Sequence, residues 1–210
     1  MRDPVRLYVK EMVSRHQFEE PILDCGAGWE PNLYQPLFPN MKYIKQDAQD
    51  YDPPCIDVVC DICQMTPIAD ESIGLVLLLE SLEHIEQPQK ALEEVFRILK
   101  PGGLLVLTTV MAMGIHRCPK DYWRFCPDGI ESLMRRFKTL DFTLEGERSF
   151  PLGIWVTAQK AEDGQEKKRF PEPKIVQAPR DDRYRLVNKL LRRFRMELRY
   201  LHKSRPRYDQ

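Results

Sequence analysis

The stretch Ile22-Leu23-Asp24-Cys25-Gly26-Ala27-Gly28 decides the fold, because an apolar strand end runs into a carboxylate and then into two glycines spaced by one residue. Glycine adopts positive φ angles easily and has no side chain to hold a ligand away from the backbone. In an α/β sheet this pattern is typical of the first strand-to-loop turn, at the carboxyl edge where nucleotide-like ligands bind. The stretch therefore predicts a ligand site as well as a buried strand.

Further apolar segments follow this turn and alternate with helical or loop segments, which is the signature of a doubly wound sheet. The sequence predicts strands over 20–24, 41–46, 56–60, 73–79, 104–110, 140–147 and 152–159, and helices over 5–16, 88–99 and 127–137. The short break at 148–151 allows the last two strands to form an antiparallel pair at one sheet edge. We therefore expect an α/β, Rossmann-like, doubly wound, seven-stranded sheet whose last strand is antiparallel.

Composition divides the chain into three regions. Residues 1–160 are expected to form the sheet domain, residues 161–180 a polar, proline-containing linker, and residues 181–210 a basic amphipathic helical tail. The net charge of the whole chain is zero, but residues 161–210 hold 15 Lys or Arg against 8 Asp or Glu. The first interpretation of the tail is an accessory helix that packs on the domain or on a second copy, as in a homodimer. Contact with a membrane surface or a lipid-linked substrate is the second, and nucleic-acid binding is disfavoured because the body is acidic and lacks a recognition module.

The six cysteines indicate the compartment. They are scattered through a mid-sized chain, which is typical of reduced thiols, and the sequence begins with charged residues rather than an apolar signal core. Cys60 and Cys63 have the spacing of a metal or redox half-site, but no second pair with zinc spacing accompanies them. We therefore expect a cytoplasmic protein, with no membrane span and no metal site.

The helix after the glycine turn separates two ligand classes. A dinucleotide fingerprint requires a third glycine at position 31, and position 31 is Pro. Pro31, Pro36 and Pro39 also leave little room for the regular helix on which a pyrophosphate depends. S-adenosylmethionine has no phosphate, so this ligand is favoured, and an NAD-dependent oxidoreductase is the disfavoured alternative.

Acidic residues stand at three successive strand ends, and all three should lie along one edge of the sheet. Asp24 ends the first strand, Asp47 follows Gly28 by 19 residues at the place where a ribose diol would be held, and Asp61 ends the third strand. Asp61 could accept a hydrogen bond from the adenine amino group while Ile62 packs on the ring. Strand-end aspartates also serve as caps and turn formers, which is the alternative interpretation. The predicted cofactor-binding residues are Asp24, Gly26, Ala27, Gly28, Asp47, Asp61, Ile62 and Leu79.

Three further segments carry a resemblance to a known family. They are Leu79-Glu80-Ser81-Leu82-Glu83-His84, Arg97-Ile98-Leu99-Lys100-Pro101-Gly102-Gly103 and Asp121-Tyr122-Trp123-Arg124-Phe125. With the glycine turn, Asp47 and Asp61-Ile62, they make the chain resemble the class I S-adenosylmethionine-dependent methyltransferases of methyltransferase type 11, most closely over residues 20–110. The resemblance implies S-adenosyl-L-methionine as cofactor. One departure is Glu30, which stands where the family's loop usually has a third glycine.

Four catalytic candidates converge on the expected mouth of the sheet. Methyl transfer is a direct displacement that mainly requires alignment, and a general base helps when the acceptor is a hydroxyl. His84 follows the fourth strand and is either a loop-holding residue or part of the site, whereas His116 is the stronger candidate for the base. Tyr122 either walls the acceptor site or caps the core, and Arg124 either holds an anionic acceptor or pairs with Asp121.

The sequence thus predicts methyl transfer from S-adenosylmethionine to a small-molecule or saccharide acceptor, at a hydroxyl. The saccharide rests on the similarity of residues 121–125 to a segment of some bacterial family members. Lack of an Asn/Asp-Pro-Pro-Tyr motif argues against amino methylation of DNA bases or glutamine. The alternative is a degenerate methyltransferase fold that binds the cofactor and acts through its basic C-terminal helix, which Glu30 and the proline-rich crossover suggest.

Overall fold

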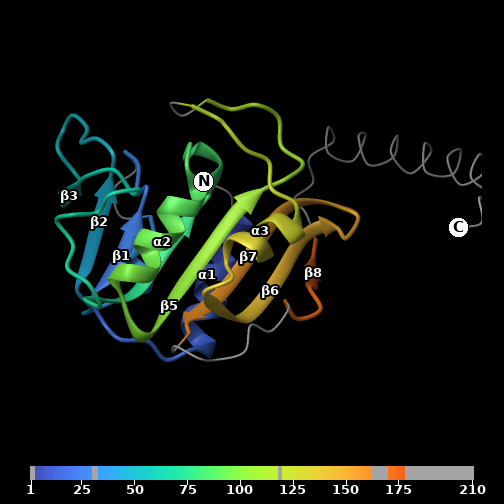
Figure 1. Cartoon of the computed structure of the whole chain (residues 1–210), viewed down its shortest axis with the longest axis horizontal. Helices are drawn as coiled ribbons and strands as arrows, with labels where there is room; N and C mark the ends of the chain where they lie inside the picture. The colour runs from blue at the N-terminus through green and yellow to red at the C-terminus, as the bar shows by residue number, and fades with distance from the viewer. Residues whose placement is uncertain (1–2, 30–32, 118–119, 162–169, 178–210) are drawn as a thin grey trace, which may run out of the picture.

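The structure is a computed structural model that describes residues 3–29, 33–117, 120–161 and 170–177. Its strands are β1 (Ile22–Cys25), β2 (Tyr43–Asp47), β3 (Val58–Val59), β4 (Ile73–Leu79), β5 (Leu99–Val110), β6 (Phe137–Glu147), β7 (Phe150–Lys160) and β8 (Lys174–Val176). Its helices are α1 (Asp3–Arg15), α2 (Pro88–Ile98) and α3 (Pro127–Leu133), with 3-10 turns η1 (Gln35–Leu37) and η2 (Leu82–His84). The strands form one sheet in the order β3-β2-β1-β4-β5-β7-β6-β8, and helices cover both of its faces (Figure 1).

The strand directions confirm the doubly wound sheet. Strands β1 to β5 pair in parallel, and β7 is antiparallel to both β5 and β6. The order reverses between β1 and β4, so the crevice outside their carboxyl ends is the place where such sheets bind ligands. The antiparallel seventh strand is confirmed, but the pair is not at the edge, because β7 lies between β5 and β6 and an eighth strand, β8, pairs in parallel with β6.

The eighth strand falls inside the range 161–180 that we expected to be a linker. It is only three residues long, and its Lys174 and Ile175 are exposed, so it carries no apolar alternation that would mark a strand. Residues 162–169 and the predicted helical tail at 181–210 lie outside the described residues. The tail's predicted contacts with a membrane surface or a second copy therefore stay predictions. Among the described residues, no helix is both long enough and apolar enough to cross a membrane.

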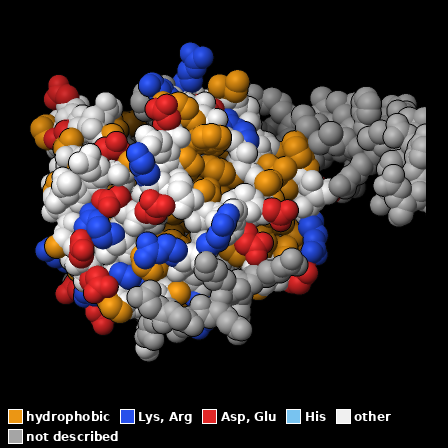
Figure 2. Space-filling view, in the orientation of Figure 1, with side chains coloured by type: hydrophobic (Ala, Val, Ile, Leu, Met, Phe, Trp, Pro, Cys, Tyr) orange, Lys and Arg blue, Asp and Glu red, His pale blue; other side chains and the backbone are white. Residues whose placement is uncertain are grey.

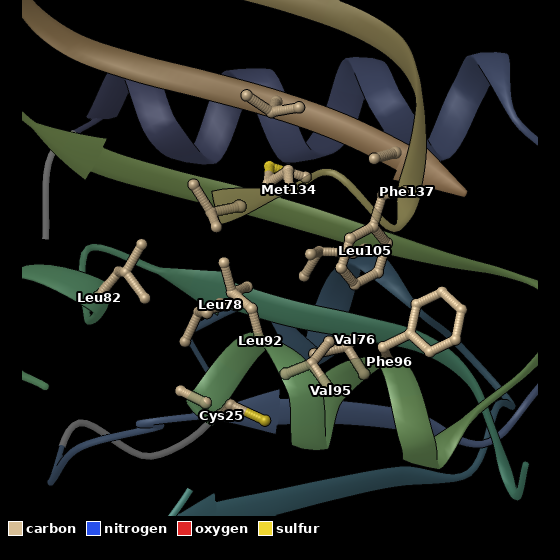
Figure 3. Close-up of a cluster of buried hydrophobic side chains, with 14 of the residues drawn as sticks. Cys25, Val76, Leu78, Leu82, Leu92, Val95, Phe96, Leu105, Met134 and Phe137 are labelled. Carbon is tan, nitrogen blue, oxygen red and sulfur yellow. The ribbon is translucent and has the colours of Figure 1, made fainter. Parts of the chain in front are cut away.

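One face of the sheet is covered by α2 and α3. Pro88 opens α2, where a missing amide donor costs nothing, and the apolar residues that follow at helical spacing are buried. Figure 3 shows Leu92 of this helix beside Leu78 of β4, and Val95 beside Val76 of the same strand. Burying one such aliphatic side chain contributes about 1.5–3 kcal/mol, so this layer fixes β1 and β4 beneath the glycine turn.

The other face is covered by α1 and by the crossover from β1 to β2. Tyr8 of α1 packs against Trp155 with ring centroids 5.2 Å apart, and its hydroxyl is hydrogen-bonded to Thr157 Oγ1 at 2.9 Å. In the described part of the crossover, the single short turn η1, with Pro36 near its start, stands in place of a regular helix. The predicted shortage of helix is confirmed there, whereas Glu30 and Pro31 lie outside the described residues.

Element boundaries differ from prediction mainly around β5 and β6. The turn expected at Pro101-Gly102-Gly103 lies inside β5, whose pairing with β4 shifts register between Ile73 and Leu75. The helix predicted over 127–137 ends at Leu133, and β6 begins at Phe137 rather than at residue 140. Local composition misleads here because the strand pairing, rather than propensity, sets where these strands begin.

Candidate cofactor and acceptor site

The glycine turn after β1 has the conformation that its sequence predicts. Gly26 and Gly28 have φ angles of 69° and 70°, and the amides of Gly26 and Ala27 donate to the carbonyl of Gln46 at 2.9 and 3.1 Å. A Cβ atom on Gly26 would lie 2.6 Å from Ser81 Oγ, whereas a Cβ on Gly28 would meet nothing within 4 Å. The turn is therefore packed tightly against the segment after β4 on one side and open at Gly28, where a ligand can approach the backbone.

Asp24 is a buried carboxylate directly beneath this turn. Its side chain is 8% exposed and accepts a 2.6 Å hydrogen bond from the Tyr43 hydroxyl. Burial raises the pKa of Asp24 to about 6, the Tyr43 hydrogen bond opposes that rise, and the negative charge of Asp47 adds to it. A cationic group bound here would favour the ionised carboxylate, as the amino group of an amino-acid ligand would.

Asp47 at the end of β2 lies against the glycine turn, as the 19-residue spacing predicts. Its Oδ2 accepts from the Gly28 amide at 2.9 Å and from the Tyr51 hydroxyl at 3.3 Å, and its Oδ1 accepts from the Ala48 amide at 2.7 Å. The half-buried carboxylate therefore holds the turn in place. A ribose diol bound at Asp47 would share a carboxylate that already contacts the Gly28 amide.

The other three residues predicted to contact the cofactor differ in how exposed they are. Asp61 is exposed, and its Oδ1 accepts from the Cys63 amide at 2.8 Å, which is the turn-forming role of the alternative interpretation. Ile62 is 9% exposed and packs with the core beneath α2, so only a small part of its surface faces outward. Leu79 ends β4 and is buried on the α1 face. All three lie at or just after strand ends on the carboxyl side.

A second group of side chains comes together after β4 and β5. Glu83 and His84 belong to η2, and His116 lies in the loop between β5 and α3, with the two imidazole rings edge to face and 4.9 Å apart. The Glu83 carboxylate is fully buried and accepts from Thr109 Oγ1 at 2.8 Å, and burial raises its pKa to about 7. The amide of His84 donates to the Ser81 carbonyl at 2.9 Å, so this group adjoins the segment that touches Gly26.

Arg124 holds the loop between β5 and α3. Its guanidinium forms two hydrogen bonds of 2.5 and 2.7 Å with Asp121, and it also donates to the carbonyls of Met113, Gly114 and Trp123 at 2.9, 2.9 and 2.7 Å. These contacts use all five N–H donors of the side chain. The paired guanidinium also holds the pKa of Asp121 well below its usual range. Arg124 thus makes the Asp121 pair, one of its two predicted roles, and has no donor left for an anionic acceptor.

Aromatic and aliphatic side chains of the same loop face solvent. Ile115, Tyr122 and Trp123 are 84%, 38% and 43% exposed. Trp123 Nε1 donates to the Ile85 carbonyl at 2.9 Å, and the amides of Tyr122 and Trp123 donate to the Glu83 carbonyl at 2.9 and 3.1 Å. In Figure 2, hydrophobic side chains gather near the end of β5 and this loop, while charged side chains dominate lower on the same face. The loop therefore offers an apolar wall for an acceptor, fixed to η2 by hydrogen bonds.

A separate groove of about 280 Å³ runs between α1 and the strands β6, β7 and β8. Tyr8, Met12, Asp141 and Trp155 are among its lining residues, and none of the predicted site residues lines it. It lies on the face of the sheet that α1 covers, so it does not bear on the cofactor site.

The sequence predicted that His84, His116 and Tyr122 lie near one another, and the structure places them so, but the prediction missed three residues that shape the site. Ser81 supports Gly26, and the backbone of Gln46 binds the glycine turn. Glu83 was quoted in a motif without a role, because no sequence pattern distinguishes a buried glutamate in a short apolar stretch from an exposed one.

Comparison with protein families identifies the domain. Residues 36–107 match the family model described as a methyltransferase domain. Over these residues the chain is similar to the methyltransferase domain, and its fold is that of solved S-adenosylmethionine-dependent methyltransferases. The match runs from the crossover after the glycine turn to the buried part of β5, so it includes Asp47, Asp61 and His84.

Individual relatives agree with this assignment. A ubiquinone/menaquinone biosynthesis C-methyltransferase of Syntrophotalea carbinolica is 30% identical over 94 residues, which cover 35% of this chain and 40% of that protein. The chain spans less than half the length of the curated relatives it matches first. A putative methyltransferase from Bacillus halodurans superposes with a TM-score of 0.59 at 14% identity, covering 74% of this chain and 99% of the other.

A further structure contains a cofactor product. The Burkholderia thailandensis 1,6-didemethyltoxoflavin-N1-methyltransferase, with bound 1,6-didemethyltoxoflavin and S-adenosylhomocysteine, superposes with a TM-score of 0.57 at 16% identity, covering 76% of this chain and 78% of the other. The cofactor of this methyltransferase class fits the residues present in this chain. The open backbone at Gly28 and the carboxylates of Asp24 and Asp47 match its adenosyl and amino-acid parts.

Proposed function

We propose that this domain transfers a methyl group from S-adenosylmethionine to a hydroxyl of a small-molecule or saccharide acceptor. One observation carries the proposal: the open glycine turn with its two carboxylates adjoins the His84–His116 pair at one edge of the sheet. Ser81 links the two groups, because its hydroxyl faces Gly26 and its carbonyl accepts from the His84 amide. The short segment from Ser81 to His84 therefore contacts both groups, which supports placing the donor and acceptor sites side by side.

The proposed role of the protein is alignment and proton removal. Bound S-adenosylmethionine supplies a methyl group attached to a positively charged sulfur. The acceptor oxygen forms a bond to that methyl carbon as the carbon–sulfur bond breaks, and the hydroxyl proton passes to a base. His116 is the proposed base, because its half-exposed ring stands at the loop surface and packs edge-on against His84. Asp24 and Asp47 orient the cofactor, and Tyr122 and Trp123 border the acceptor.

The exposed loop side chains favour an acceptor with an apolar or aromatic portion. Ile115, Tyr122 and Trp123 present rigid apolar surface next to the histidine pair, and such surface contributes area at low entropic cost. One relative is named as a demethylmenaquinone methyltransferase and another as a ubiquinone/menaquinone biosynthesis C-methyltransferase, although they match only part of this chain. A cytoplasmic location is part of the same proposal, supported by the free thiols among the described cysteines.

Calorimetric titration with S-adenosylhomocysteine tests the cofactor site. A ligand at one hundred times its dissociation constant stabilises the protein by about 2.7 kcal/mol, which for a domain of this size is a rise in melting temperature of roughly 5–10 °C. Asp47→Asn should weaken binding by roughly tenfold, whereas Glu93→Gln, which changes an exposed carboxylate on α2, should not alter it. No heat and no change in melting temperature would refute the cofactor site.

Turnover distinguishes the enzyme from the alternative scaffold. A panel of hydroxylated aromatic compounds and saccharides, assayed for S-adenosylhomocysteine release, should include an acceptor for the native chain. His116→Gln should reduce turnover while leaving S-adenosylhomocysteine affinity unchanged. Strong cofactor binding with no release above the buffer rate would favour the degenerate scaffold that Glu30 suggests.

A further inference from the structure

Glu83, His84 and His116 form a compact group of three metal-ligating side chains. Each offers one ligand atom, a carboxylate oxygen or an imidazole nitrogen, and these three atoms lie within 4.8 Å of one another. Two of the residues come from η2 and the third comes from the loop after β5, so tertiary packing rather than sequence spacing brings them together. The sequence motifs therefore gave no sign of such a site.

The hydrogen bonds behind the two histidines suit metal ligation. The Nδ1 of His84 contacts the carbonyl of Lys120, and the Nδ1 of His116 lies 3.1 Å from the carbonyl of Gly114. A proton on Nδ1 that is donated to a carbonyl leaves the lone pair on Nε2, and metal-bound histidines almost always have such a donor contact on their other nitrogen. With Nδ1 protonated in this way, Nε2 is the ligand atom of each ring, and both rings are half-buried.

The carboxylate of Glu83 supplies a separate, independent observation. The side chain is fully buried, and while Oε2 accepts from Thr109, Oε1 has no hydrogen-bond partner among the described residues. A buried carboxylate oxygen without a partner is costly, and buried charges are normally paired or bound to a metal. This unpartnered oxygen lies beside two imidazoles, and a cation bound to all three groups would give it the partner that it lacks.

The surrounding charges permit a cation. Glu80 is close enough to act electrostatically on Glu83, and it adds negative charge. Arg124 is a positive group beside the site, with its Nη2 3.4 Å from His116 Nδ1, but its charge is balanced by the two contacts with Asp121. The three ligands and Glu80 therefore give the group a net negative character that favours a divalent ion.

We propose that Glu83, His84 and His116 bind a divalent transition-metal ion of the zinc type beside the acceptor site. Two imidazoles and one carboxylate suit Zn²⁺, Co²⁺ or Fe²⁺, whereas Mg²⁺ and Ca²⁺ prefer oxygen ligands throughout. Three protein ligands leave coordination positions open, as in catalytic rather than structural sites. The ion would bind the acceptor oxygen and lower the pKa of its hydroxyl, whose proton would then pass to water, so His116 would act as the base only in the metal-free protein.

Titration of Co²⁺ into the full-length chain, after treatment with a chelator, tests the site without any need for turnover. We expect one equivalent of bound cobalt, with weak visible absorption of nitrogen and oxygen ligands and no strong thiolate band. Glu83→Gln, His84→Ala and His116→Ala should each weaken binding at least tenfold. Two control variants, His16→Ala on α1 and the Cys60→Ser/Cys63→Ser pair, should bind as the native chain does.

Several results would overturn the site. These are the absence of saturable cobalt binding, unchanged affinity in His116→Ala, or a thiolate band that disappears in the Cys60→Ser/Cys63→Ser variant. Circular dichroism checks that each variant is folded, and if Glu83→Gln is not, His116→Ala decides because its side chain lies in an exposed loop. The inference adds to the proposed function but is measured apart from it. Cobalt binding with no S-adenosylhomocysteine binding would refute the cofactor site alone, and the reverse result would refute the metal site alone.

Discussion

Replacing Asp24 by Asn should stabilise the protein at neutral pH while weakening its cofactor site. Burial raises the pKa of Asp24 from 3.8 to about 6. At 1.36 kcal/mol for each pKa unit, ionising this carboxylate in the folded protein costs about 3 kcal/mol relative to the unfolded chain. Asparagine has nearly the same shape and can still accept the Tyr43 hydroxyl through its carbonyl oxygen, so it removes the charge with little change in packing.

The pH dependence of stability separates this effect from others. Because the folded-state pKa of Asp24 lies above its unfolded value, the folded protein binds the proton more tightly, and the free energy of unfolding falls as pH rises from about 4 to about 6. Above about pH 6 the stabilisation from the protonated Asp24 carboxyl is fully lost. The difference in stability between Asp24→Asn and the native chain should therefore be small near pH 4 and reach about 2–3 kcal/mol in favour of the variant at pH 7.5.

Urea denaturation at several pH values measures this difference, with each free energy extrapolated to water. Subtracting the two curves cancels the contributions of Glu83 and the other carboxylates, which titrate in both proteins. Glu93→Gln on α2 is the control, because it removes an exposed carboxylate and should give a flat difference. A constant loss of stability in Asp24→Asn at every pH would refute the argument, since it would mean that hydrogen bonding rather than desolvation dominates at this position.

Three other predictions follow from the packing. Gly26→Ala should destabilise the protein by roughly 2 kcal/mol or more and abolish S-adenosylhomocysteine binding, because its Cβ would lie 2.6 Å from Ser81 Oγ. Gly28→Ala should cost only about 1 kcal/mol, from the strain of positive φ alone, and chemical denaturation of both variants measures the difference. Leu78→Ala should lower the free energy of unfolding by about 3–4 kcal/mol, because the side chain is fully buried between β4 and α2; unchanged stability in urea would contradict that packing. Arg124→Lys should speed proteolytic cleavage within residues 111–126, because lysine cannot replace five directed donors; cleavage at the native rate would show that other contacts hold the loop.

The sheet could be predicted from sequence because its central strands carry a strong local signal. Residues 73–79 are a continuous apolar run, and β4 has these bounds with every residue buried. The turn at Gly26 and Gly28 and the position of Asp47 beside it were also predictable, since both depend on spacing within one supersecondary unit. By contrast, β8 was missed because its three residues gain their strand structure only by pairing with β6.

The acceptor side was less predictable, because it depends on contacts between segments that are far apart in sequence. His84 and His116 are separated by 31 intervening residues, and only the folding of the loop onto η2 brings their rings to 4.9 Å. From the sequence, Arg124 could either hold an anionic acceptor or pair with Asp121. In the structure its N–H groups all donate to Asp121 and three backbone carbonyls. The surroundings of Glu83 likewise depend on this loop, because the amides of Tyr122 and Trp123 donate to the backbone carbonyl of Glu83.

The contact between α1 and β7 has a consequence for how the chain is made. Tyr8 is hydrogen-bonded to Thr157, which lies 149 residues later in the chain. The apolar side of the first helix therefore cannot pack fully against the sheet until most of the domain has been synthesised. At about 5–20 residues per second, a ribosome needs roughly 7–30 s to produce that interval. During that time the nascent chain exposes Val5, Val9 and Met12, and it is a candidate for chaperone binding. Moving the first sixteen residues to follow β7 by circular permutation would shorten this exposure and should reduce aggregation during expression.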